Sequence, residues 1–434
     1  MLSNEQIILF GFPKWEGDYM KSTVHLAKEL AKNNQVLYVD YPYTWIDLIR
    51  GLKGKPFIPV KEIMGWNKRL KPLESETNKN LHLLRLPPIL PMNWVNQQSR
   101  FEQLARFNTR MIVPTVQKTT RQLGFSDPIV INAFLPALGI PLKDAFNEKL
   151  LVYYCYDEIQ SAPWIKKHGA RQEAKFMELA DLVITSSVQL HKNKGPLAKD
   201  IGIVKNGVDL KLFGKENLVP IAPLSSNKYK YNIGYIGSID SRLDVPLLTH
   251  AIQEHPNLFF SFVGRIVDQE IYSCLSQFEN VKFYGPQDIE QLPSFIEQFD
   301  IGIIPFLKNK LTASIYPLKV NEYLARAKPV VSTNFANLQD FTKVIKIAKN
   351  QAAFTNALSS MAADNDLNIK EMRLNIAAEN AWENRGLQFG ELIKRKLLTK
   401  KRNAATEKRI KPFQSTGSSI FEERNRTNEL KAIT

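Results

Sequence analysis

An alternation of short apolar segments with amphipathic stretches most constrains the fold of this 434-residue chain, and it occurs twice. In the first half, the apolar segment at residues 7–12 is followed by Val24, Ala27, Leu30 and Ala31 at helical spacing. Such strands separated by helices predict a parallel sheet covered on both faces. The further segments of this half are candidate strands at 36–41, 81–86, 128–134, 150–157 and 182–187, with helices near 97–123 and 170–180.

The second half of the chain restarts the pattern after a polar segment that contains Pro and Ser. Its candidate strands are 232–238, 259–265, 281–286, 300–306 and 328–333. We therefore predict the α/β class, with two Rossmann-like parallel-sheet domains at 1–213 and 232–375, joined by a linker at 214–231 and facing a cleft. Ligands of such sheets bind beyond the carboxyl ends of the strands, so the cleft is the expected site.

Composition excludes several classes of protein. Hydrophobic residues make up 44% of the chain and aromatic residues 10%, which excludes global disorder. The chain has no apolar run of about 18 residues, and its N-terminus lacks the pattern of a signal peptide. With only two cysteines, Cys155 and Cys274, we expect a reducing, cytoplasmic location.

The net charge of +15 is concentrated in two stretches. Residues 394–411 hold nine Lys or Arg and one Glu, and we expect residues 397–434 to form a basic, flexible tail. Residues 45–72 mix seven Lys or Arg with Trp45, Ile49 and Trp66, a composition that fits attachment to an anionic membrane face. The alternative is a solvated loop. Positive charge also fits nucleic acid, but no nucleic-acid-binding module is present, so no nucleic-acid partner is expected.

The first predicted turn runs from Gly11 to Asp18 and contains Lys14 and Gly17. It is not GxGxxG, so a dinucleotide-binding fingerprint is absent. A flexible loop before a helix N-terminus still favours an anion, to which Lys14 would add charge. The alternative is that Gly11 and Gly17 only permit the turn.

A stronger signal lies after the strand at 300–306. Pro317 suits the first position of a helix, and Lys319 and Glu322 share one helical face. A helix N-terminus with a lysine in its first turn suits a diphosphate, and a carboxylate on that face can accept hydrogen bonds from a ribose diol. The alternative is a plain surface ion pair between the two side chains.

The segment around P-L-K-V-N-E-Y-L-A (317–325), followed by PVV at 329–331, resembles the nucleotide-binding signature of GT-B glycosyltransferases. The resemblance is to the family-4-like, group 1 retaining enzymes of the teichuronic acid and exopolysaccharide type. Supporting segments are 15–40, LVYYCYDE at 151–158, LADLVITSS at 179–187, NGVDLKLF at 206–213 and IGYIGSIDSRLD at 233–244.

The resemblance implies roles for particular residues. Glu322 matches the second glutamate of the E-x7-E motif, which contacts the donor ribose, whereas the first glutamate is replaced by Ser314. Arg242 matches the arginine that neutralises the diphosphate, and Asp244 replaces a lysine expected after it. The remaining candidates for binding the nucleotide sugar are Gly237, where the loop approaches the phosphates, Arg265, and Gly285 near the base.

Breaking a sugar–diphosphate bond leaves negative charge on the leaving oxygen, which Arg242, Lys319 and a helix N-terminus would stabilise without a metal or other cofactor. Asp157 is a candidate acid or base at the edge of the first sheet, and the alternative is a helix cap. The D-x-D at 364–366 lies in a polar connection after a helix, and we predict no metal site there.

The sequence thus predicts a metal-independent glycosyltransferase that moves a sugar, with retention, from a nucleotide diphosphate to a glycan or lipid-linked acceptor. The expected setting is cell-surface polysaccharide biosynthesis in the cytoplasm or on the inner membrane face. The first domain would bind the acceptor and the second the donor, with residues 376–396 returning to the first domain. The alternatives are a nucleotide-sugar epimerase and a non-catalytic paralogue that scaffolds a membrane assembly.

Overall fold

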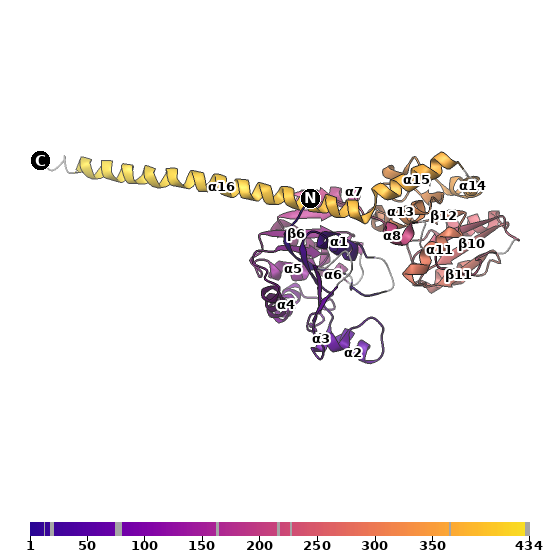
Figure 1. Ribbon diagram of the computed structural model, residues 1–434, viewed down its shortest axis with the longest axis horizontal. Coiled ribbons are helices and arrows are strands. Elements are labelled where there is room, and N and C mark those ends of the chain that lie inside the picture. The colour runs from indigo at the N-terminus through magenta and orange to yellow at the C-terminus, as the bar shows by residue number, and fades with distance from the viewer. Residues whose placement is uncertain are drawn as a thin grey trace.

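The computed structural model of the protein describes residues 1–12, 14–17, 21–73, 80–161, 165–214, 218–225, 228–363 and 366–429. For residues 161, 166, 404 and 407–429 only the backbone is described. The described residues form two α/β domains and one long C-terminal helix (Figure 1). Every helix in the described part of the chain is too short or too polar to traverse a lipid bilayer.

The N-terminal domain is built on an eight-stranded sheet in the order β3-β4-β2-β1-β5-β6-β7-β8. All neighbouring strands are parallel except β3, which runs antiparallel to β4 at the sheet edge. The central strands are apolar and buried along their whole length, as a sheet covered on both faces requires. The strands are β1 (Gln6–Phe10), β2 (Gln35–Val39), β3 (Leu70–Pro72), β4 (Leu81–Leu84), β5 (Ile129–Ala133), β6 (Leu150–Cys155), β7 (Leu182–Thr185) and β8 (Ile201–Ile203).

Helices cover both faces of this sheet and form two separate cores. On one face α1 contributes Leu26 and Leu30, and on the other α6 contributes Phe176 and Met177. Two further helices, α2 and α3, lie at the lower end of the domain in Figure 1, away from the sheet. The helices are α1 (Ser22–Ala31), α2 (Trp45–Leu52), α3 (Val60–Met64), α4 (Gln98–Gln122), α5 (Pro136–Leu142), α6 (Lys166–Leu179) and α7 (Val188–Lys194), with 3₁₀ turns η1 (Ile159–Ser161) and η2 (Gly195–Leu197).

The C-terminal domain has a six-stranded, fully parallel sheet in the order β11-β10-β9-β12-β13-β14. Its strands are β9 (Tyr231–Ile236), β10 (Leu258–Val263), β11 (Val281–Gly285), β12 (Ile301–Ile304), β13 (Val330–Thr333) and β14 (Lys346–Ala348). Its helices are α8 (Leu210–Phe213), α9 (Val245–Glu254), α10 (Gln269–Leu275), α11 (Leu292–Glu297), α12 (Lys310–Ala313), α13 (Leu318–Ala325), α14 (Gln351–Ala362) and α15 (Leu367–Glu379), with η3 (Ile289–Gln291) and η4 (Gln339–Phe341).

The predicted fold class, two parallel-sheet α/β domains, is confirmed. Three strands, β3, β8 and β14, were not predicted. Each has only three residues, and these strands lie at the edges of the sheets, where a strand needs few apolar side chains.

The chain crosses between the domains at two points that lie side by side. Val204 belongs to the N-terminal core and Val208 to the C-terminal core, so the first crossing precedes the predicted linker at 214–231. At the second crossing, the N–H of Val208 donates to the carbonyl of Asn380 (3.0 Å), and the N–H of Trp382 donates to the carbonyl of Val208 (3.1 Å). The boundary differs from the prediction because the motif at 206–213 packs on the second domain.

The long helix α16 (Trp382–Glu429) begins at this crossing and returns along the N-terminal domain (Figure 1). Its Phe389 and Ile393 are buried in the N-terminal core beside α1. The expected structureless tail from residue 397 is wrong for the backbone of residues 397–429, which continue the helix. Lys, Arg, Glu and Ala recur here and are good helix formers even without apolar periodicity, whereas Pro412 and Gly417 within the same helix are poor ones.

Candidate active site

A pocket of about 150 Å³ opens at the carboxyl edge of the C-terminal sheet. It is bounded by the loops that follow β9, β10 and β11 and by the first turns of α13, so the parallel topology brings four distant segments together. Its lining residues are Ile236, Gly237, Ser238, Val263, Gly264, Arg265, Pro286, Gln287, Leu292, Leu318, Lys319 and Glu322.

Lys319 occupies the first turn of α13, whose N-cap is Pro317 rather than a first helical residue as predicted. Its ammonium lies 5.7 Å from the ring centroid of Tyr235 and 5.5 Å from that of Phe306. Burial, and secondarily the charge of Arg242, lowers the pKa of Lys319 to about 8. A half-buried lysine in the first turn of a helix is a strong anion-binding group, because its ammonium adds to the positive end of the helix formed by the backbone N–H groups of that turn.

Glu322 lies one turn along the same helix and is 8% exposed. Burial raises the pKa of Glu322 to about 7, although Lys319 acts in the opposite direction. The alternative interpretation of these two residues as a plain surface ion pair is wrong, because both line the pocket and Glu322 is buried.

Gly237 permits the close approach of its loop to Lys319. Its φ is +141°, and a Cβ there would lie 2.3 Å from Cε of Lys319. Gly264 is equally constrained, because its φ is +145° and a Cβ would lie 2.1 Å from the Gly237 carbonyl oxygen. Only glycine fits either position without moving the loop that borders the pocket.

Arg242 lies beside Lys319 and shares its aromatic support, with its guanidinium carbon 5.4 Å from the centroid of Phe306. It is held by a bidentate pair with Asp240, at 2.8 Å from Nε to Oδ1 and 2.6 Å between the second nitrogen and Oδ2. Burial opposes ionisation of Asp240, but the bonds from Arg242 lower the pKa of this carboxyl below its usual value. The side chains of Arg242 and Lys319 thus converge on one ring.

The other predicted residues are placed as follows. Arg265 lines the pocket, and Gly285 ends β11 with a φ of +70° and accepts a 2.8 Å hydrogen bond from Gly264. Asp157 lies two residues after the end of the N-terminal strand β6, and its carboxylate accepts from the N–H of the next residue, Glu158 (2.8 Å), just before η1. Burial raises the pKa of Asp157, although the N–H of Glu158 and, to a smaller extent, the charge of Arg242 act in the opposite direction.

Gly11 and Lys14 are not part of this pocket. A Cβ at Gly11 would lie 2.0 Å from the Tyr38 hydroxyl, so glycine is required there for packing. Lys14 lies over the ring of Tyr43 at 4.9 Å, on the side of α2. Pro13 and Asp18 of the same turn lie outside the described residues.

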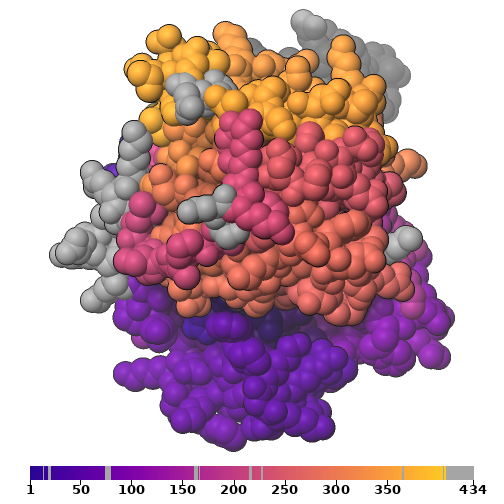
Figure 2. All heavy atoms as spheres, turned by 90° about the vertical axis from the view of Figure 1, so that its right-hand side faces the viewer, coloured from indigo at the N-terminus to yellow at the C-terminus, as the bar shows by residue number. Residues whose placement is uncertain are grey.

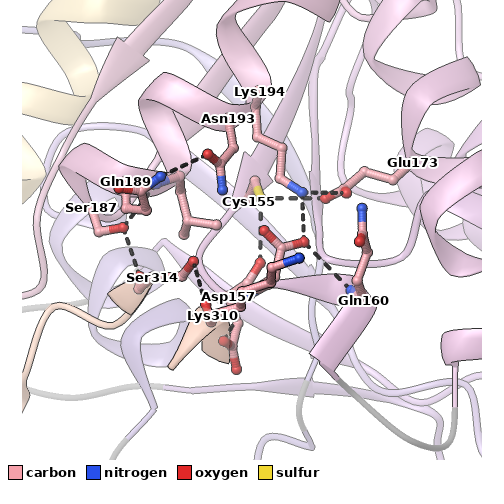
Figure 3. Close-up of polar contacts among 12 residues, drawn as sticks. Cys155, Asp157, Gln160, Glu173, Ser187, Gln189, Asn193, Lys194, Lys310 and Ser314 are labelled. Atoms are coloured by element: carbon pink, nitrogen blue, oxygen red, sulfur yellow. Dashed lines mark hydrogen bonds and ion pairs between the residues drawn. The ribbon is translucent and has the colours of Figure 1, made fainter. Parts of the chain in front are cut away.

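Two contacts between the domains were missed by sequence reasoning. The Ser187 hydroxyl donates to the Ser314 carbonyl (2.7 Å), and the Asn206 amide donates to the Tyr316 carbonyl (3.2 Å). Both contacts hold the segment before α13 against the N-terminal domain, and Figure 3 shows the first of them. Ser314, which stands where the family glutamate would be, is 2% exposed. A side chain that binds a distant carbonyl leaves no pattern in the sequence.

Of the D-x-D segment, residues 364 and 365 lie outside the described residues. Asp366 caps the N-terminus of α15 by accepting from the N–H groups of Asn368 and Ile369. No group of three or more His, Cys, Asp or Glu side chains that could hold a metal ion is found among the described residues.

Comparison with known proteins decides the family. Residues 230–364, which contain the pocket, match the group 1 glycosyl transferases. The chain is 31% identical over 265 residues to TuaH of Bacillus subtilis (strain 168), a glycosyltransferase named for teichuronic acid biosynthesis, and covers 67% of that protein with 56% of its own length. The chain belongs to the group 1 glycosyltransferases.

This group 1 glycosyltransferase also shares its fold with solved structures over most of its length. Sucrose-phosphate synthase from Thermosynechococcus elongatus has a TM-score of 0.65 at 16% identity, covering 90% of this chain and 99% of that chain. Anabaena HepE, solved with UDP and glucose, has a TM-score of 0.60 at 14% identity, covering 90% of this chain and all of the other. The predicted GT-B fold is therefore confirmed.

Proposed function

We propose that the protein transfers a sugar, with retention, from a nucleoside diphosphate to a glycan or lipid-linked acceptor in cell-surface polysaccharide biosynthesis. The observation that carries the proposal is the convergence of Lys319 and Arg242 on Phe306 beside the start of α13. These two cations match the negative charge that develops on the leaving diphosphate, so the step requires no metal or other cofactor. Glu322 would accept from the ribose hydroxyls, and Arg265 would add charge at the rim.

The relatives support a uridine nucleotide as the donor. HepE was solved with UDP and glucose. Trehalose-6-phosphate synthase of E. coli was solved with UDP-2-fluoroglucose. It is 12% identical to this chain, with a TM-score of 0.63 over 91% of this chain and 99% of that chain. The name of TuaH supports a cell-surface polysaccharide as the product. Release of UDP from a panel of UDP-sugars, followed with and without an acceptor glycan, tests the function. If the protein neither binds UDP nor turns over any nucleotide sugar, the proposal fails.

The affinity for UDP should depend on pH because of Lys319. Its pKa of about 8 means that the side chain loses its charge as the pH rises above 8, whereas bound diphosphate favours the charged form. By linkage, we expect the Kd for UDP to rise about tenfold or more between pH 7 and pH 9.5. Calorimetric titration should show this rise for the wild type. A Lys319→Met variant should bind weakly with a flat profile, and a wild-type profile that is equally flat would contradict the assignment.

We also propose that the α2–α3 region rests on an anionic membrane, at the inner face in a cytoplasmic enzyme. Trp45, Ile46, Ile49, Leu52, Phe57 and Trp66 are all exposed there, Trp66 by 66%. The same stretch carries seven Lys or Arg. Figure 2 shows this part as the purple lower projection, below a recess beneath the C-terminal domain. Aromatic and basic side chains together bind the interface of an anionic bilayer.

Removing the apolar anchors should weaken membrane binding. We expect the triple variant Trp45→Ser, Ile49→Ser, Trp66→Ser to bind phosphatidylglycerol vesicles at least tenfold more weakly, since each buried side chain contributes about 1.5 kcal/mol or more. Co-sedimentation with vesicles measures the effect, and Val267→Ser with Leu367→Ser, which removes exposed apolar residues elsewhere, is the matched control. Equal binding of the triple variant and the wild type would refute this proposal.

A further inference from the structure

A second, larger groove lies between the domains, on the side of α6 and α7. Its volume is about 790 Å³, within the range of roughly 300–1,000 Å³ typical of ligand sites. One wall comes from α6, α7 and η1 of the N-terminal domain, and the other from residues 308–313 of the C-terminal domain. The groove shares no lining residue with the pocket at α13.

The floor of the groove is a buried ion-pair cluster. The Lys194 ammonium lies 2.8 Å from Oε1 of Glu158 and 2.8 Å from Oε2 of Glu173, and the Tyr153 hydroxyl donates to the other oxygen of Glu173 at 2.8 Å. Figure 3 shows Lys194 and Glu173 facing each other, with the Cys155 thiol beside them and 3.4 Å from Oε1 of Glu173. Because these charged groups are paired with one another, the floor is rigid and polar. A ligand in the groove would therefore be recognised mainly by the residues of the walls.

The walls combine amides with lysines. On the N-terminal side are Gln160, Gln189 and Asn193, and Nε2 of Gln189 donates to Oδ1 of Asn193 at 2.8 Å. Lys308 and Lys310 are exposed on the opposite wall. Amides both donate and accept hydrogen bonds, as sugar hydroxyls do, whereas lysines only donate and attract anions. The pairing of both kinds of group fits a saccharide that carries anionic substituents.

We infer that this groove binds a segment of the acceptor glycan, a saccharide bearing carboxylate or phosphate groups. The inference rests on the proposed transferase function and adds where the acceptor chain lies and what charge it carries. The groove adjoins the reaction site, because Glu158 in its floor directly follows Asp157, whose carboxylate interacts electrostatically with Arg242. Ser314, which directly follows Ala313 in the groove wall, is held by the hydroxyl of Ser187.

Calorimetric binding of trigalacturonic acid, with neutral maltotriose as the comparison, tests the inference. We expect the wild type to bind the anionic trisaccharide at least tenfold more tightly than maltotriose, with affinity falling as salt is added. The double variant Lys308→Ala, Lys310→Ala should lose that preference, and Gln189→Ala, Asn193→Ala should weaken both sugars. Lys192→Ala, an exposed lysine of α7 outside the groove, is the matched control and should bind as the wild type does.

The inference is overturned if neither trisaccharide binds, if maltotriose binds as well as trigalacturonic acid, or if the groove variants bind like the control. A parallel titration with UDP separates this failure from failure of the proposed function. UDP binding without trisaccharide binding refutes the groove alone. Trisaccharide binding that depends on Lys308 and Lys310, in a protein that does not bind UDP, supports the groove and refutes the donor site.

Discussion

Replacing Lys319 by Met is expected to lower the rate constant of sugar transfer at least a hundredfold. The substitution keeps most of the side-chain volume over Tyr235 and Phe306 but removes the charge nearest the start of α13. In a preorganised site, losing one group that stabilises a developing anion costs about 3 kcal/mol of barrier. Arg242→Met should give a loss of similar size, because its guanidinium lies over the same ring.

Single-turnover measurement of UDP release from the preferred donor checks this expectation, since it separates chemistry from product release. Lys343→Met, an exposed lysine of the same domain outside the pocket, is the control and should keep the wild-type rate. Full transfer rates in both Lys319→Met and Arg242→Met would exclude these residues from the reaction and would remove the observation on which the proposed function rests.

Replacing Lys194 by Met is expected to destabilise the N-terminal domain by about 3–5 kcal/mol. The side chain is 5% exposed and is the cation between Glu158 and Glu173. Without it, two carboxylates remain in a buried space with no counter-charge. Burial already raises the pKa of Glu173, and loss of Lys194 would raise it further. The folded state would then bind protons more readily than the unfolded state, so the destabilisation should be smaller at pH 5 than at pH 8.

Urea unfolding followed by circular dichroism at both pH values measures this effect. Lys192 lies on the same helix but is exposed. The Lys192→Met variant should therefore change the free energy of unfolding by less than about 0.5 kcal/mol. An unfolding midpoint of Lys194→Met equal to that of the wild type would show that the cluster contributes nothing to stability.

The sequence predicted the fold well where apolar residues formed continuous runs. All central strands of both sheets were anticipated because burial on two faces demands uninterrupted apolar segments, as in β6 and β10. Three-residue edge strands such as β8 carry too little pattern to be recognised. The helical continuation of residues 397–429 was missed because helix propensity, unlike packing, leaves no apolar periodicity.

The candidate site was partly predictable for a topological reason. Residues that follow parallel strands meet at one edge, so Gly237, Lys319 and Glu322 were expected to converge, and they do. The bidentate partner Asp240 was not anticipated, although it lies only two residues from Arg242. The contacts of Ser187 and Asn206 across the domain boundary were also not anticipated. Each joins a side chain to a backbone carbonyl more than 100 positions away in the sequence.

The paired crossings at Val208 and Trp382 have a mechanical consequence. The two segments that cross between the domains lie side by side and are joined by hydrogen bonds. Such a pair of segments can bend but resists twisting and sliding. We therefore expect relative motion of the two halves to be mainly a swing about these crossings. Such a swing would separate Ser187 from Ser314 while leaving the geometry of Lys319, Arg242 and Phe306 intact, because those three move as one body.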